Sequence, residues 1–176
     1  LGTQEVAIDN VAPTATVSGA ATIAEGSLYT LTVGPITDPG ADTRSAYTIA
    51  WGDGLSDSFT AAEWTAAAGN FTHTYADGAG NATITVSTTD EDGSFTLGTQ
   101  EVAITNVTPT AVVSGAATTA EGSLYTLTVG AVSDPGADTR TQYTIAWGDG
   151  LSDTFSAAEW TAAAGSFTHT YADGPG

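Results

Sequence analysis

The 176-residue sequence contains no cysteine, no methionine and only two basic residues, both of them arginines. Without cysteine, no disulfide cross-links the fold and no thiolate serves as a nucleophile or metal ligand. No apolar run approaches the about 18 residues of a membrane-spanning helix, and no charged-then-apolar leader is present, so we expect no membrane span or signal peptide within this segment. We therefore expect an apolar core to be the main source of stability, with bound metal as an optional addition.

Acidic residues outnumber basic residues by 20 to 2, which gives a net charge of −18. A chain with this charge repels phosphate backbones and anionic membrane surfaces. We therefore expect no nucleic-acid partner and no direct membrane insertion. Cations are the ligands that such a composition favours.

A domain-sized unit is repeated along the chain. Leu1–Ile8 returns as Leu97–Ile104, a period of 96 residues, and 67 of the 80 alignable positions are identical. This predicts a tandem array. Residues 1–10 form the last strand of a preceding repeat, 11–107 a complete unit, and 108–176 a second unit lacking its last two strands. Such an open edge indicates an excerpt of a longer array or, alternatively, an edge covered by the N-terminal strand of a neighbouring molecule.

Short strands with turn signals between them dominate each unit. Tyr47, Ile49 and Trp51 alternate with small residues before a Gly-Asp-Gly turn, which predicts a strand with three core side chains; the second copy has Tyr143, Ile145 and Trp147. The segment 61–68 is either a short helix or an irregular alanine-rich edge. Further strands are expected at 15–17, 28–33, 55–60, 71–75, 82–86 and 95–104. The pattern predicts an all-β sandwich.

Three motifs in this order resemble the PKD domain, an immunoglobulin-like β-sandwich. They are the Tyr-x-Ile-x-Trp-Gly-Asp-Gly run, the Phe71–Tyr75 strand followed by Asp77-Gly78, and Ile84–Val86 followed by Asp90–Gly93. The 38–42 loop resembles the variant found in long repetitive bacterial surface proteins. The resemblance implies tandem immunoglobulin-like sandwiches, an extracellular or cell-surface location, calcium binding in some members, and no catalysis.

Catalytic residue patterns are absent from the sequence. The two histidines, His73 and His169, each stand alone in a strand, which is typical of a structural residue. No serine lies in a nucleophile elbow, and the glycines form no phosphate-binding loop. We therefore expect no enzyme.

Aspartates gather in loops that an immunoglobulin-like path places at one end of the unit. Ca²⁺ takes six to eight oxygen ligands, mostly from carboxylates and carbonyls on turns. The alternative is that these aspartates stabilise the turns themselves. Glu25, Asp53 and Asp77 are expected at the opposite end. The candidate calcium ligands are Asp38, Asp42, Asp90, Asp92, Asp9 and Asn10, with Asp134 and Asp138 in the second copy.

Two remaining features bear on function. Arg44 and Arg140 each follow an Asp-Pro-Gly-Ala-Asp loop and are expected to form a local ion pair with it. Trp51 and Trp64 are either core residues or a platform for sugar rings. We expect a spacer segment of a secreted surface protein, adhesin stalk or filament, whose partners are neighbouring repeats or copies of the same protein. The alternative is a carbohydrate- or protein-binding accessory module of a secreted hydrolase or adhesin, with a glycan or surface protein as its ligand.

Overall fold

The computed structural model describes residues 2–173. The chain divides into two compact units, and the boundary in the sequence falls between Asn106 and Val107. Within the described residues, all regular elements of both units are β-strands except for one short helix in each unit. No helix within residues 2–173 has the length and apolar character needed to cross a bilayer. The two units are described separately.

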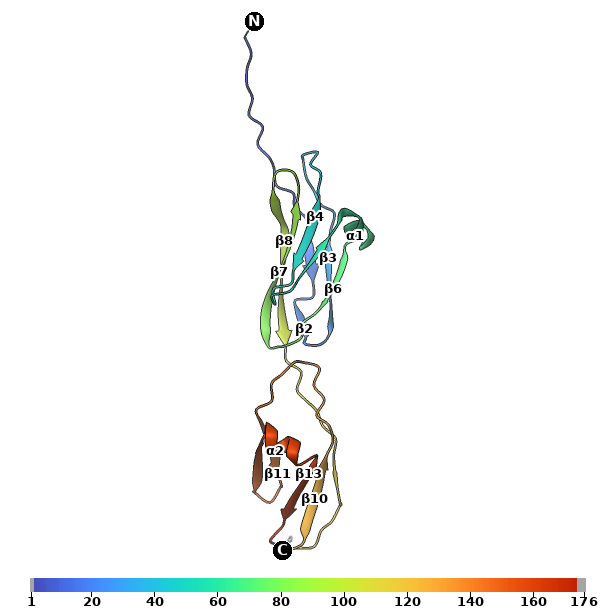
Figure 1. The fold of residues 1–176 in the computed structure, drawn as a ribbon, viewed down its shortest axis with the longest axis vertical. Coiled ribbons are helices and arrows are strands. Elements are labelled where there is room, and N and C mark those ends of the chain that lie inside the picture. Colours follow the sequence, from blue (N-terminus) through green and yellow to red (C-terminus); the bar gives the residue numbers. More distant parts are fainter. Residues whose placement is uncertain (1, 174–176) are drawn as a thin grey trace. The chain divides into compact units, whose positions relative to one another are not determined.

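The first unit contains two sheets (Figure 1). The smaller has the order β1-β3-β6, with β3 antiparallel to both neighbours. The larger has the order β2-β8-β7-β4-β5, in which only the β2–β8 pairing is parallel. The strands are β1 Val17–Gly19, β2 Thr22–Ala24, β3 Leu28–Val33, β4 Ala46–Ala50, β5 Ser56–Phe59, β6 Asn70–Thr74, β7 Gly80–Thr89 and β8 Ser94–Thr105.

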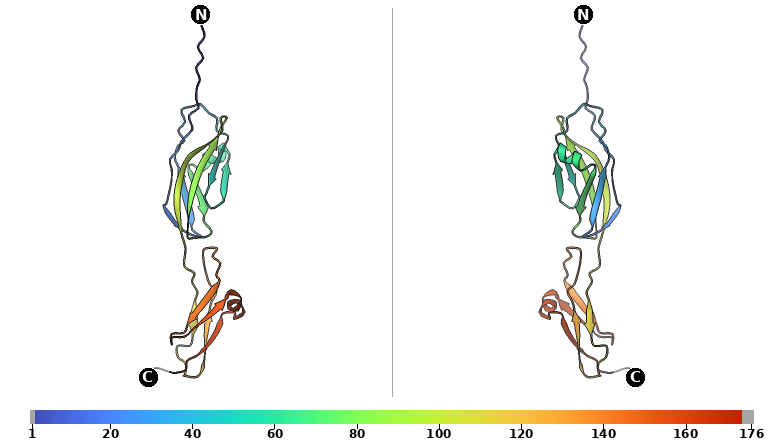
Figure 2. Two further views of the ribbon diagram at one scale, coloured as in Figure 1. Left: turned by 90° about the vertical axis from the view of Figure 1, so that its left-hand side faces the viewer. Right: turned by 90° about the vertical axis from the view of Figure 1, so that its right-hand side faces the viewer.

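The core of this unit lies between the two sheets, which are seen from the side in Figure 2. Alternate residues of β3 are buried, as the pleat requires, and they pack against buried residues of the larger sheet. Burying apolar side chains from both sheets in one cluster is the main stabilising contribution. The buried set includes Tyr29, Leu31, Val33 and Phe71 from the smaller sheet and Ile49, Ile84, Val86 and Val102 from the larger.

Strand β4 and the residue that follows it carry three large buried side chains. Tyr47, Ile49 and Trp51 are all buried, while the residues between them are partly exposed. The strand ends where Gly52 adopts a φ of +86° and passes so close to β7 that a Cβ would lie 2.7 Å from the Thr83 nitrogen. Only glycine meets both conditions at this turn. Asp53 Oδ1 then accepts a hydrogen bond from Leu55 N at 3.0 Å.

Two polar contacts link the sheets beside this turn. His73, on β6, stacks on the Trp51 ring with centroids 4.7 Å apart, and its Nε2 lies 2.7 Å from Asp53 Oδ2. Tyr75 donates its hydroxyl to the Trp51 carbonyl at 3.0 Å. The first histidine is therefore a half-buried structural residue of the sandwich.

The alanine-rich segment after β5 forms helix α1, Ala61–Ala66. Thr60 caps it: the Glu63 N–H donates to the Thr60 hydroxyl, and the Glu63 carboxylate accepts from the Thr60 N–H at 2.8 Å. This reciprocal capping box settles the choice between a helix and an irregular edge. Glu63 follows Thr60 by three residues, which is the sequence signature of that motif.

The N-terminal segment differs from the sequence-based expectation. Residues 2–12 carry no strand, and Val6 and Ile8 are exposed. The same residues recur as Val102 and Ile104 of β8, where both are buried between β7 and β2. The difference follows from pairing: no strand of residues 2–173 is paired with the first copy of this segment. The parallel strand β2 was not anticipated.

The second unit repeats the described part of this plan with fewer strands. Its sheets have the orders β13-β10-β9 and β11-β12, and its buried residues are Val129, Ile145, Trp147 and Phe167. Tyr143 is half-buried and stacks on Trp160 with ring centroids 4.3 Å apart. The elements are β9 Val113–Gly115, β10 Leu124–Val129, β11 Gln142–Ala146, β12 Ser152–Ser156, α2 Ala157–Ala162 and β13 Ser166–Thr170.

Candidate metal centre

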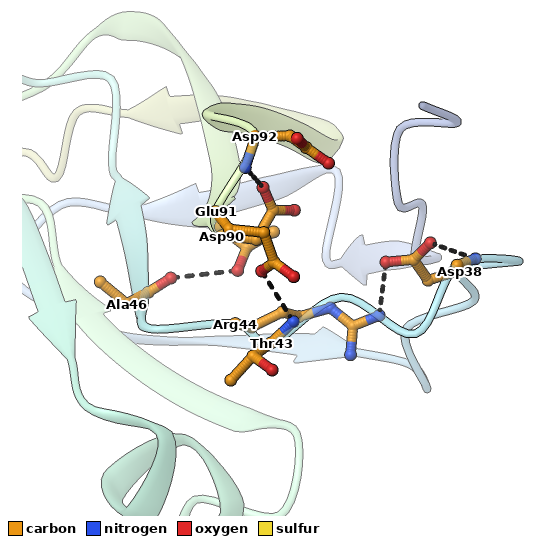
Figure 3. Close-up of polar contacts among 9 residues, drawn as sticks. Asp38, Thr43, Arg44, Ala46, Asp90, Glu91 and Asp92 are labelled. Carbon is orange, nitrogen blue, oxygen red and sulfur yellow. Dashed lines mark hydrogen bonds and ion pairs between the residues drawn. The ribbon is translucent and has the colours of Figure 1, made fainter. Parts of the chain in front are cut away.

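Three segments of the first unit bring carboxylates together. They are the loop between β3 and β4, the turn between β7 and β8, and the chain that leads into β1. The first two are joined directly, because the Thr43 N–H donates to Glu91 Oε2 at 2.9 Å (Figure 3). Glu91 was not among the sequence candidates, since its partner is a backbone group 48 residues away.

Asp38 lies at the start of the β3–β4 loop, and its side chain is 2% exposed. Its Oδ1 accepts the Gly40 N–H at 3.1 Å, and its Oδ2 pairs with Arg44 Nη2 at 2.9 Å. Figure 3 shows the Arg44 guanidinium reaching Asp38 from the same loop. The ion pair predicted for Arg44 is thus formed.

Asp90 begins the β7–β8 turn and is 8% exposed. Its Oδ1 accepts the N–H groups of Asp92 and Gly93 at 3.0 and 3.1 Å, so this oxygen closes the turn. Its Oδ2 is buried without a hydrogen-bond partner in the protein. A buried carboxylate oxygen in this condition is costly unless a cation or another donor compensates it.

Asp42 Oδ2 is likewise buried and has no protein hydrogen-bond partner. Gly40 leaves the space next to it open, since a Cβ there would lie 2.5 Å from this oxygen. Burial raises the pKa of the Asp42 carboxyl above its ordinary value, and the negative charges of four neighbours raise it further; these are Asp38, Glu91, Asp90 and Asp92. The cluster is therefore short of positive charge.

The spacing of the three carboxylates fits one metal ion. Asp38, Asp42 and Asp90 each offer an oxygen, and these atoms lie within 4.8 Å of one another. Oxygens that share a Ca²⁺ lie about 2.3–2.6 Å from it, and hence at most about 5 Å apart. A hard, oxygen-rich set with unpartnered buried atoms matches Ca²⁺ better than a softer metal, which prefers nitrogen or sulfur ligands.

A hollow of about 420 Å³ adjoins this trio and shares Asp42 with it. Its walls include the chain that leads into β1, the 39–40 turn and the tip of the β7–β8 turn. The oxygen-bearing side chains around it are those of Asp9, Asn10, Asp42 and Asp92. The six candidate ligands of the first unit thus lie in the trio or around the adjoining hollow.

The second unit contains only part of such a site. Asp134 Oδ1 accepts the Gly136 N–H at 3.4 Å, and its Oδ2 lies 3.8 Å from Arg140 Nη1. This ion pair is 0.9 Å longer than the 2.9 Å pair of the first unit. Asp138 lies further along the same loop.

The aromatic side chains of the first unit pack largely against one another. Every aromatic residue within 2–173 is buried or half-buried. Trp51 is fully enclosed and donates its Nε1–H to Asp57 Oδ2 at 2.8 Å. Trp64 stacks on Tyr47 with ring centroids 4.5 Å apart and also contacts Phe71. Trp51 is therefore a core residue, whereas Trp64 is half-buried and packs against Tyr47 and Phe71.

Comparison with known proteins adds no assignment: a scan against protein-family models and a search of curated proteins both found no match to this chain.

Proposed function

We propose that this chain is a tandem array of immunoglobulin-like, PKD-type sandwiches that acts as a spacer in a secreted or cell-surface protein, adhesin stalk or filament. Calcium at the domain junction, held in this chain by the acidic loops of the first unit, fixes the chain that enters that unit. One observation carries this proposal. The chain that leads into β1 lies beside the two acidic loops of the first unit, where three carboxylates group together and an adjoining hollow is lined by further acidic side chains. The near-identity of the repeats supports a mechanical role, which needs many similar units.

The topology of the first unit supports the immunoglobulin-like assignment. Its sheets, β1-β3-β6 and β2-β8-β7-β4-β5, correspond in order to the two sheets of such domains. A buried tryptophan ends β4, and Tyr75 donates its hydroxyl to that tryptophan's carbonyl between β6 and β7. A buried tryptophan at the end of the strand that leads to the Gly-Asp-Gly turn is in keeping with the buried tryptophan of immunoglobulin folds, and this supports the proposal.

Calcium would supply positive charge and multiple oxygen bonds at this site. Asp38, Asp42 and Asp90 would hold the ion, and Asp9, Asn10 and Asp92 stand around the adjoining hollow. Binding would relieve the repulsion among these carboxylates and restrain the chain at residues 8–11. A restrained entry segment gives a stiffer joint than a free linker does.

The test compares thermal unfolding of the chain in millimolar CaCl2 and in excess chelator. At 100 times its dissociation constant, a ligand of the folded state alone stabilises by about 2.7 kcal/mol. For a unit of this size the melting temperature rises by about 10 °C or more. Asp90→Asn removes most of this gain, whereas Glu101→Gln, an equal change of charge on an exposed residue of β8, retains it. If the melting temperature is the same in CaCl2 and in chelator, the proposed metal site is wrong.

The mechanical part of the proposal has its own measurement. Backbone 15N relaxation at residues 6–11 reports the mobility of the entry segment, and order parameters there rise from below about 0.6 toward about 0.85 when calcium binds. If calcium stabilises the unit while this segment stays mobile, the ion serves the fold and not the joint.

A further inference from the structure

The cation already present in the acidic loop is Arg44. Its Nη2 holds Asp38 Oδ2 at 2.9 Å, and the Gly40 N–H occupies Asp38 Oδ1. Asp38 therefore has no oxygen free of a hydrogen bond, although it belongs to the trio. Any metal ion that Asp38 ligates must share an oxygen with the guanidinium or with a backbone N–H.

We propose that Arg44 is an internal competitor of calcium, which weakens the metal affinity of this site by holding Asp38 and by placing a positive charge beside the ion. This inference rests on the proposed calcium site and adds a regulator to it. A backbone N–H can share a carboxylate oxygen with a metal at little cost, because the oxygen has a second lone pair. A guanidinium brings a full charge that repels the metal ion.

Burial makes the competition effective. The Asp38 side chain is 2% exposed and the Arg44 side chain 22% exposed, so water screens their interaction less than it screens a surface pair. The Arg44 Nε is buried without a protein hydrogen-bond partner, so the guanidinium is held by one contact and not by a bidentate fork. A single contact can be broken when a divalent ion takes the Asp38 oxygen.

The first test measures calcium affinity by titration calorimetry for the full chain and its variants. Arg44→Gln removes the charge and is expected to tighten binding by about tenfold, while Arg44→Lys keeps the charge and stays near the wild-type affinity. Arg140→Gln, the same change in the second unit, leaves the affinity of the first site unchanged. Equal or weaker binding by Arg44→Gln overturns the inference and makes Arg44 a positioning residue for Asp38.

The second test needs no variant. The chain has two arginines and no lysine, so a 15N spectrum of arginine side chains contains only two Nε–H signals. Calcium is expected to shift the Arg44 signal, and the Arg140 signal is expected to stay. If calcium binds and the Arg44 signal does not move, the competition does not occur. If the unmodified chain binds no calcium, the proposed function itself fails, which is a different result.

Discussion

Asparagine in place of Asp53 isolates the contact that closes the sandwich beside the Gly-Asp-Gly turn. The wild-type carboxylate uses both oxygens: Oδ1 accepts the Leu55 N–H at 3.0 Å, and Oδ2 lies 2.7 Å from His73 Nε2. Asparagine retains an oxygen for Leu55 and replaces the carboxylate oxygen that faces the imidazole. The substitution therefore spares the turn and removes one charge-assisted contact between the turn and β6.

The expected loss follows from the burial of this pair. Hydrogen bonds to charged groups contribute about 1.5–3 kcal/mol when they are well enclosed. The Asp53 side chain is 25% exposed and the His73 side chain 10% exposed, so the lower part of that range applies. We expect Asp53→Asn to reduce the free energy of unfolding by about 1.5–2 kcal/mol at pH 7. For a domain of this size, each kcal/mol lowers the melting temperature by about 4–8 °C.

The pH dependence gives this prediction its sign. Burial by itself would raise the pKa of Asp53, but the hydrogen bonds from His73 and the Leu55 N–H, with the charge of His73, lower it below 3.8. A carboxyl whose pKa is depressed on folding stabilises the protein above its unfolded pKa and loses that contribution as the pH falls through the folded pKa. The carboxylate therefore contributes fully above about pH 4, and the difference between wild type and variant falls as the pH drops through the depressed pKa of folded Asp53.

Differential scanning calorimetry between pH 7 and pH 2 measures this difference directly. The second unit supplies a matched variant, because Asp149 Oδ2 lies 2.8 Å from His169 Nε2 and its Oδ1 accepts the Leu151 N–H. Asp149→Asn is expected to show the same pH profile for its own transition. A loss that is equally large at pH 7 and pH 2 would refute the argument, since the carboxylate charge would then contribute nothing.

Two further predictions concern the same turn. Gly52→Ala should destabilise more than Gly148→Ala: both glycines have φ near +87°, which costs alanine about 1–2 kcal/mol, but only at Gly52 does a Cβ meet the β7 backbone. Hydrogen exchange in each unit measures this, and equal losses would contradict the contact with β7. Tyr75→Phe leaves the Trp51 carbonyl without its donor and should cost about 1–3 kcal/mol in urea unfolding, whereas a neutral result would mean that water replaces the hydroxyl.

Much of the strand pattern was predictable because each strand carries a local signal. Leu28–Val33 alternates apolar and polar side chains, and the structure has β3 with those bounds. The alternation of Tyr47, Ile49 and Trp51 likewise indicates which side chains are buried. Two glycines around Asp53 mark the end of the strand by their backbone freedom. In these cases two to eight neighbouring residues contain the physical cause.

Other features depend on partners that are distant in the sequence. Strand β2 forms because Thr22–Ala24 pairs in parallel with Ala103–Thr105. A segment of three residues of mixed polarity gives no sequence signal for this pairing. The segment at residues 2–8 is unpaired, but its identical copy at residues 98–104 is part of strand β8, so composition alone does not decide its state. The link from Thr43 to Glu91 was missed for the same reason.

The sequence left two roles open for the aspartates of the candidate metal centre, as metal ligands or as residues that stabilise turns. The structure shows that the same aspartates accept hydrogen bonds within turns and also form a cluster of negative charge. Asp90 Oδ1 accepts hydrogen bonds within its turn, whereas Oδ2 is buried and has no hydrogen-bond partner in the protein. Asp38 gives one oxygen to its turn and the other to Arg44. Asparagine at position 90 keeps the turn acceptor and removes the charge, whereas alanine removes both. If Asp90 only stabilises its turn, Asp90→Asn keeps the thermal stability of the unit and Asp90→Ala lowers it. If Asp90 also binds a cation, either substitution removes the increase in melting temperature that calcium produces.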